Sequence, residues 1–523
     1  MLFSPSQLKA VFRQFLVICG VILLSRLTKN WGVLILAAYG IFCSLTRKDG
    51  KALIVYLLLS LIPMVNPIIM PRYGHFSMIA RLSTLAMTFC LVLGGASRRG
   101  NHMIPVGGLF VYLAIAVISS IQGYFPLISF LKIINFLIFI LGVYIGTRNI
   151  HHSAKDIQLL RNTFIALSAF IVYGSLFTLP FPSVAYFTSA SRAISTYGYS
   201  YANSILAAGG KKLFCGVTAH SQFLGPMIAC VFGWLLCDMF LVEKKFSWLH
   251  IVLLLPIPII AFMTRSRLAL LTLFVAAATS VHFCLNRTAL SPKTRGKFKV
   301  AAFLAFTLML LMGITQQIRH GTVSRWLRKT DNVQDDGRTL VDAVTQSRQG
   351  LIYQNMIDFK RNIMLGSGFQ VDTYTRKAYK EGRATLFSAT IEKGLLPLMV
   401  LGETGIIGGC VFVLFLISFF SICFTKKYKA TPALFIVLLT TNMAEATFFS
   451  PAGAGGTFWI YLVAGGFIID MNRYSQKNTF PRNFLSNDGP ECPTDEGEIF
   501  AADAPPEGRQ NSPDDLQKDF ENA

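Results

Sequence analysis

Long apolar runs separated by short charged segments constrain this chain more than any other feature. Runs of roughly 17 to 25 residues recur, which is the length that an α-helix needs to cross a bilayer. Charged residues make up 14% of the chain and hydrophobic residues 53%, whereas soluble domains carry about 25% charged residues. The runs are continuous and lack the alternation of barrel strands. The sequence therefore predicts an all-α, polytopic membrane protein with about 12–14 transmembrane helices.

The fullest reading of these runs gives about fourteen spans. They are predicted near residues 13–27, 31–46, 52–69, 78–95, 104–122, 125–146, 162–180, 216–240, 248–263, 267–285, 299–318, 396–424, 432–449 and 456–471. The first run lacks a clear small-residue cleavage site and a second run soon follows it, so we predict a retained anchor.

The positive charges predict an orientation, because Lys and Arg in short loops are retained in the cytoplasm. With the N-terminus inside, the inner loops receive most of the basic clusters that separate the spans. The net charge of +22 is not accompanied by a soluble domain that interleaves bases with stacking aromatics. Membrane orientation and anionic ligands explain the charge better than nucleic acid does.

The same pattern divides the chain into four parts. Residues 1–318 carry the N-terminal spans, 319–395 form a large outer loop, 396–472 carry the last spans, and 473–523 form an acidic tail. The loop is too polar to be a span, and apolar residues at helical intervals after residue 351 predict that it is partly helical. The tail lacks any apolar period, so we predict that it is disordered and cytoplasmic.

Two groups of arginines lie on the predicted outer side. Arg265 and Arg267 stand in a hairpin-length connection between spans, and Arg338 and Arg348 lie in the large loop. Such arginines can simply snorkel to headgroups or face solvent, although the positive-inside rule makes them less expected on this side. Planar guanidinium groups bind phosphate oxygens through paired hydrogen bonds. If these groups converge, they would form a diphosphate site.

Three further ionisable residues are candidates for accessory roles. His220 begins a predicted span, and Glu403 and Glu445 lie within or at the edges of apolar runs, where an ionisable group is costly. The alternatives are that His220 has only a structural role and that the two glutamates form polar contacts between helices. The cysteines mostly lie inside apolar runs without metal-like Cys/His spacing, so we expect no metal site and no cofactor.

Four segments, in consistent order, resemble the O-antigen ligase and polymerase superfamily. Residues 213–225 are similar to its Gly-x-x-x-His-x-Asn-x-x-Gly segment, and residues 264–267 to its Ser-Arg hairpin. Residues 347–348, Tyr353 and 362–369 resemble its Ser-Arg, aromatic and Pro-Leu-x-Gly-x-Gly pattern. Finally, 401–408 resembles its Glu-x-Gly-x-x-Gly opening of the next span.

The resemblance covers roughly residues 210–470 and implies a metal-independent glycosyltransferase with a GT-C-like fold in a bacterial inner membrane. Its donor would be an undecaprenyl-diphosphate-linked glycan, used on the periplasmic side to make O-antigen, capsule or exopolysaccharide. The diphosphate would be held by Arg265 or Arg267 and by Arg348. The acceptor would be a glycan or a lipid, and membrane lipids and other polysaccharide-assembly proteins are expected partners.

The chain departs from the ligase pattern at one place. Ligases of this family carry a His-Asn pair shortly before the Glu-x-Gly segment, whereas Gly394 and Leu395 occupy that stretch here. We therefore expect Glu392 to act as the substitute base, with burial at the membrane edge raising its pKa. A polymerase or an exopolysaccharide-type ligase fits better than a lipid A-core ligase. The rival function is a lipid-linked-oligosaccharide flippase, although we find no internal inverted repeat typical of transporters.

Overall fold

A computed structural model describes most of the chain in segments. They are residues 5–70, 76–95, 106–150, 153–186, 214–243, 247–264, 266–284, 352–371, 394–423, 428–443, 447–451 and 453–478. The chain divides into two units after Lys477.

Among the described residues, the regular secondary structure is helical apart from one isolated β-bridge, Val65 with Thr218. Seven of their helices are long and apolar enough to cross a membrane: Ser6–Thr28, Pro126–Ile150, Ala154–Phe177, Ser221–Glu243, Arg267–Cys284, Leu396–Ser421 and Gly453–Asn472. Shorter apolar helices accompany them: Asn30–Leu45, Met78–Gly94, Gly107–Ile121, Trp248–Met263 and Ala430–Asn442. The predicted multi-pass, all-helical membrane protein is confirmed.

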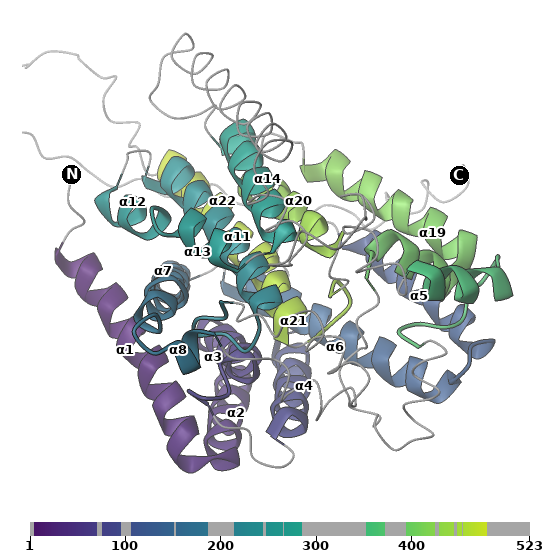
Figure 1. Ribbon diagram of the computed structural model, residues 1–523, viewed down its shortest axis with the longest axis horizontal. Coiled ribbons are helices and arrows are strands. Elements are labelled where there is room, and N and C mark those ends of the chain that lie inside the picture. Colours follow the sequence, from purple (N-terminus) through teal and green to yellow (C-terminus); the bar gives the residue numbers. More distant parts are fainter. Residues whose placement is uncertain are drawn as a thin grey trace, which may run out of the picture. The chain divides into compact units, whose positions relative to one another are not determined.

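The first helices pack against one another as one group. Helix α2 (Asn30–Leu45) contacts both α3 (Asp49–Leu61) and α4 (Phe76–Gly95), and α4 also contacts α6 (Pro126–Ile150) (Figure 1). Helix α1 (Pro5–Thr28) lies along α7 (Ala154–Phe177), and many large apolar side chains of α1 and α2 are exposed. An exposed apolar face on such helices is the surface that contacts lipid.

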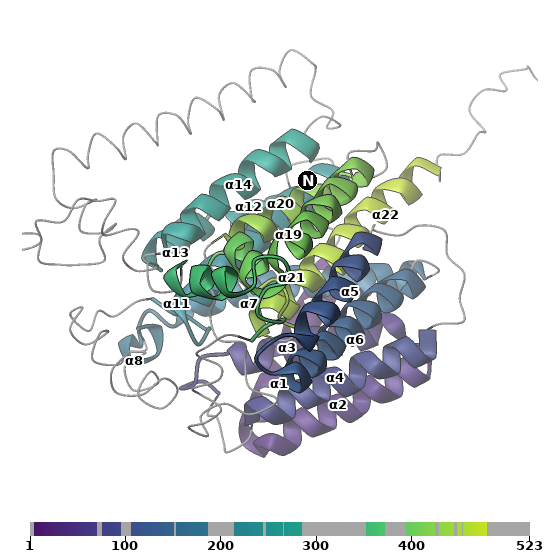
Figure 2. The same cartoon turned by 90° about the vertical axis from the view of Figure 1, so that its right-hand side faces the viewer.

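A second group surrounds one of the two most buried long spans that the structure describes. Helix α11 (Ser221–Asp238) packs against α14 (Arg267–Cys284) and α20 (Ala430–Asn442). Helix α19 (Leu396–Cys423) packs along α5 (Gly107–Ile121), as Figures 1 and 2 both show. Small residues allow the close approach: a Cβ on Gly225 of α11 would lie 2.5 Å from the Cβ of Ala269 in α14.

Two predicted spans are broken or shortened in the part of the chain that the structure describes. The run 52–69 becomes α3 and a 3₁₀ turn, Ile62–Met64, which contains Pro63. The run 248–263 becomes α12 (Trp248–Leu254) and α13 (Ile257–Met263), separated at Pro256, because proline lacks the amide N–H that continues a helix. The predicted span 299–318 lies outside the described residues.

The last span, predicted over 456–471, is longer and less regular than expected. It consists of α21 (Gly453–Ile460), the π-helix η4 (Tyr461–Gly465) and α22 (Gly466–Asn478). A second π-helix, η2 (Met239–Glu243), extends α11. The remaining named helices are α7 (Ala154–Phe177), which starts earlier than predicted because Ser153 caps it, and α8 (Pro182–Ala185).

Segments predicted on the same side of the membrane contact one another. On the inner side, the Asp470 carboxylate accepts hydrogen bonds from the amides of Lys429, Ala430 and Thr431 at 2.9, 3.0 and 3.2 Å. On the outer side, Gln370 Nε2 donates to the carbonyl of Phe449 at 2.7 Å. These contacts are therefore consistent with the predicted order in which successive spans cross between the two sides of the membrane.

Candidate functional site

The first candidate region is a junction between residues 362–371 and the kinked start of α19, which we call the α19 junction. Ser367 N donates to Gly402 O at 2.9 Å, and Gly368 N donates to Glu403 O at 3.0 Å. In return, Ile406 N donates to Ile363 O at 2.9 Å. The interruption of α19 leaves backbone N–H and C=O groups without partners inside the helix. Residues 362–371 form hydrogen bonds with these groups, so they are not left unpaired within the membrane.

Two glycines make this close approach possible. Gly405 interrupts α19 at φ 64°, ψ −164°, and Gly366 has φ 70°. A Cβ on Gly405 would overlap the backbone of Met364, and one on Gly366 would overlap the backbone of Glu403. Only glycine adopts these conformations readily and leaves space for the opposing chain.

The connection between α5 and α6 closes the other side of the α19 junction. Ser119 Oγ donates to Glu403 O at 2.6 Å, and Ser129 Oγ donates to Phe369 O at 2.6 Å. Lys132 Nζ donates to Gln370 O at 2.8 Å. Side chains from α5 and α6 therefore hold the loop by its carbonyl groups.

The second candidate region lies where α11 and α14 begin, and we call it the α11 junction. The chain before α11 pairs with the break after α3: Asn66 N donates to Val217 O at 2.8 Å, and Ala219 N donates to Met64 O at 2.8 Å. Asn66 Nδ2 also donates to Gly216 O at 3.0 Å. This pairing fixes the chain immediately before His220, the N-cap residue of α11.

The hairpin between α13 and α14 completes the α11 junction. Ser266 Oγ accepts from Ala269 N at 3.2 Å, so Ser266 caps the start of α14. A Cβ on Gly225 would lie 3.3 Å from both Ser266 Cβ and Thr264 Oγ1. The Ser-Arg hairpin and the segment 213–225, two of the four segments that carry the resemblance, are therefore in contact where the structure describes them.

Phe449 and Gly453, which lie close together in the sequence, each contact one of the junctions. Phe449 meets Phe369 edge to face, with ring centroids 5.3 Å apart. A Cβ on Gly453 would lie 3.1 Å from the end of the Met64 side chain. The two junctions are therefore connected through one short segment rather than lying on unrelated parts of the molecule.

The predicted site residues are distributed unevenly over these regions. Glu403 is buried, 1% exposed, in the α19 junction, and the buried Tyr112 lies beside it and Thr404. His220 and the half-buried Arg267 stand at the starts of the adjacent helices α11 and α14. The other predicted site residues lie outside the described residues: Arg265, Arg338, Arg348, Glu392 and Glu445.

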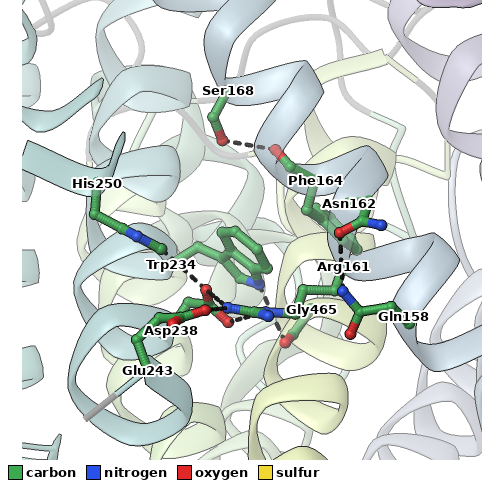
Figure 3. Close-up of polar contacts among 10 residues, drawn as sticks. All are labelled: Gln158, Arg161, Asn162, Phe164, Ser168, Trp234, Asp238, Glu243, His250 and Gly465. Atoms are coloured by element: carbon green, nitrogen blue, oxygen red, sulfur yellow. Dashed lines mark hydrogen bonds and ion pairs between the residues drawn. The ribbon is translucent and has the colours of Figure 1, made fainter. Parts of the chain in front are cut away.

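A third polar region, a buried ion network, was missed by the sequence reasoning (Figure 3). Arg161 of α7 donates through Nε to Asp238 Oδ1 at 2.8 Å and through Nη2 to Asp238 Oδ2 at 2.7 Å. Arg161 also pairs with Glu243 of η2. His250 Nε2 of α12 lies 3.0 Å from Asp238 Oδ2. Asp238 falls inside a predicted apolar span, and this was the signal that could have revealed the network.

The network joins elements and leaves little capacity for a ligand. Arg161, Asp238 and His250 are at most 3% exposed, and Glu243 is 25% exposed. The Arg161 guanidinium already forms two hydrogen bonds with the Asp238 carboxylate and a further ion pair with Glu243. Two parallel hydrogen bonds to one carboxylate are the geometry of a strong structural pair. Asp238 accepts from α7 and contacts α12, so the network ties α7, α11, η2 and α12 together at the predicted cytoplasmic end.

Among the described residues, no group of three or more His, Cys, Asp or Glu side chains could hold a metal ion. A scan against protein-family models found no matching family, and a search of curated proteins found no similar sequence.

Proposed function

We propose that this chain is a glycosyltransferase of the O-antigen ligase and polymerase type, with a GT-C-like arrangement of about 12–14 spans. It would transfer or polymerise undecaprenyl-diphosphate-linked glycan on the periplasmic face of a bacterial inner membrane, in O-antigen, capsule or exopolysaccharide synthesis.

The observation that carries the proposal is the pairing of the segments that resemble this superfamily. The Gly-x-Gly turn at 366–368 forms hydrogen bonds with the Glu-x-Gly segment at 402–405. The two segments are 34 to 39 residues apart in the sequence. Residues 214–225 contact the hairpin at 264–269. Segments that are distant in sequence and lie together in space are what a composite site requires.

The proposed reaction needs a charged, metal-independent leaving-group site. An acceptor hydroxyl oxygen attacks the anomeric carbon, its proton passes to Glu392, and the bond from that carbon to the diphosphate oxygen breaks. Undecaprenyl diphosphate leaves with the bonding electrons. Guanidinium groups placed in advance stabilise the charge that develops, and we assign this role to Arg348 with Arg265 or Arg267, and with Arg338 as a further contact.

The test uses purified protein in liposomes with a defined undecaprenyl-diphosphate-linked glycan. New glycosidic bonds in the intact protein, lost in Arg348→Ala and poorly restored in Arg348→Lys, would support the proposal, because lysine supplies a point charge without the fork. Normal activity in both variants would remove Arg348 from the site, and no bond formation under any condition would reject the proposal.

The rival proposal is a flippase for lipid-linked oligosaccharide. A transporter of this kind would also be polytopic and basic, as this chain is with its net charge of +22. The same liposomes discriminate between the two functions: movement of the glycan lipid between leaflets without any new bond would support the flippase. Chain growth without such movement would support the transferase.

A further inference from the structure

The helix over residues 352–361 buries two polar side chains and exposes two large apolar ones, next to the exposed bases Lys360 and Arg361. Asn355 and Asp358 are 6% and 2% exposed, whereas Tyr353 and Met356 are 68% and 41% exposed. Because the burial of apolar side chains stabilises a segment in water, a helix surrounded by water would turn these side chains the other way. This arrangement is typical of a segment whose outer surroundings are lipid.

The exposed apolar surface continues past the end of this helix. Ile363 is 48% exposed and Met364 is 57% exposed. Their carbonyl groups accept hydrogen bonds from Ile406 N at 2.9 Å and Ile407 N at 3.3 Å. Residues 363–364 are therefore fixed at the same level as the start of the straight part of α19.

The position of α19 sets the depth of that level. Its exposed apolar stripe begins at Ile406 and Ile407 and continues through Val413, Leu414 and Ile417. Beyond Gly405 the helix runs to Cys423, roughly 27 Å at about 1.5 Å per residue, which is close to the hydrocarbon thickness of about 30 Å. Ile406 thus lies near one boundary of the hydrocarbon layer, and Ile363 and Met364 lie beside it.

The polar groups of the helix suit the membrane interface. Tyrosine is enriched at the level of the headgroups, and the exposed Lys360 can extend its charge into water along an apolar stem. Arg361 hydrogen-bonds to the Tyr124 hydroxyl and lies 5.1 Å from the centre of its ring. The helix therefore carries apolar, aromatic and basic groups in the arrangement of an interfacial amphipathic helix.

We propose that the 352–361 helix and residues 363–364 are embedded in the leaflet that surrounds the start of α19. Lipid acyl chains would cover Tyr353, Met356, Ile363 and Met364, in continuity with the lipid-facing stripe of α19. This anchoring would hold the α19 junction at the membrane surface, and it is independent of the proposed glycosyl transfer.

The test is photocrosslinking of the full chain in vesicles of phosphatidylethanolamine and phosphatidylglycerol. In separate variants, p-benzoylphenylalanine replaces Met356 or Tyr353. The positive control carries the probe at Leu414 in the apolar stripe of α19. The matched control carries it at the half-buried Gln354, on the flank of the same helix. Mass spectrometry of the crosslinked peptides identifies what the probe has reached. We expect acyl-chain adducts at 353 and 356 at a yield similar to that at 414, and mainly intramolecular products at 354.

Each alternative outcome rejects the proposal. Crosslinks from 353 and 356 to another segment of this chain, or to a second copy of it, would show that protein covers this face. An absence of lipid adducts at both positions, with adducts present at 414, would show that the face lies in water. Because the readout does not depend on catalysis, failure here leaves the proposed function untouched.

Discussion

At the residue scale, the Arg161–Asp238 pair is a buried interaction whose loss we expect to be costly. Both groups are almost fully buried and are paired by two hydrogen bonds. Removing one partner of a buried pair costs about 3–5 kcal/mol, because the remaining charge is left uncompensated. We therefore expect Asp238→Leu to lower the Tm of the purified protein strongly in a thermal unfolding assay.

Glu243 provides the control for this prediction. It also pairs with Arg161, but it is 25% exposed, so water can solvate the groups that lose their ion pair in Glu243→Gln. We therefore expect Glu243→Gln to lower the Tm much less than Asp238→Leu does. The double variant Arg161→Met with Asp238→Leu should recover part of the Tm, because neither charge remains buried. Equal losses in Asp238→Leu and Glu243→Gln would contradict this account.

Asp470 is a second residue with a specific and testable role. Its carboxylate accepts from three consecutive amides at the start of α20 and from Thr431 Oγ1 at 2.9 Å, so a residue of α22 caps a different helix. Loss of a cap costs about 0.5–2 kcal/mol. We expect Asp470→Ala to lower Tm and Asp470→Asn, which keeps a carbonyl acceptor, to lower it less. A smaller loss in the alanine variant would exclude the cap.

At the scale of elements, the interruption of α19 at Gly405 determines whether the α19 junction can form. A side chain at this position would meet the backbone of Met364, and the conformation at φ 64°, ψ −164° would add about 1–3 kcal/mol of strain to any residue other than glycine. We expect Gly405→Ala to detach residues 362–369 from α19 and to reduce glycosyl transfer in the liposome assay. Limited proteolysis should then cut this segment faster than in the unaltered protein.

Gly20 is the matched control for that variant. It lies in the interior of α1, and a Cβ there would meet nothing within 4 Å. Because alanine is favoured over glycine in a helix by up to about 1 kcal/mol, Gly20→Ala should keep or raise Tm and leave both transfer and proteolysis unchanged. A similar response of the two variants would remove the special role of Gly405.

At the scale of the whole molecule, the contacts fix which segments share a side, and the basic loops predict which side is cytoplasmic. Truncations fused to alkaline phosphatase or to green fluorescent protein test the prediction. With Arg47 inside and Gly123 outside, fusion after Arg47 should give fluorescence and fusion after Gly123 should give phosphatase activity. The opposite pattern would invert the orientation and place both junctions in the cytoplasm.

The sequence by itself determined the class of protein and the approximate location of most spans. Hydrocarbon imposes a minimum length and apolarity on a helix that crosses it, so this information is local and can be read from each run. The helical spacing after residue 351 also indicated a helix where the structure has one, over 352–361.

The tertiary structure alone decided which segments meet and which faces are covered. The spacing could not show that Asn355 and Asp358 face protein while Met356 is exposed, because the period of a helix is the same whether lipid or protein lies beside its apolar face. The spacing of apolar residues also could not show that Asp238 pairs with Arg161, which is 77 residues away in the sequence. Such pairs depend on how helices pack, which is a property of the assembled chain and not of any one run.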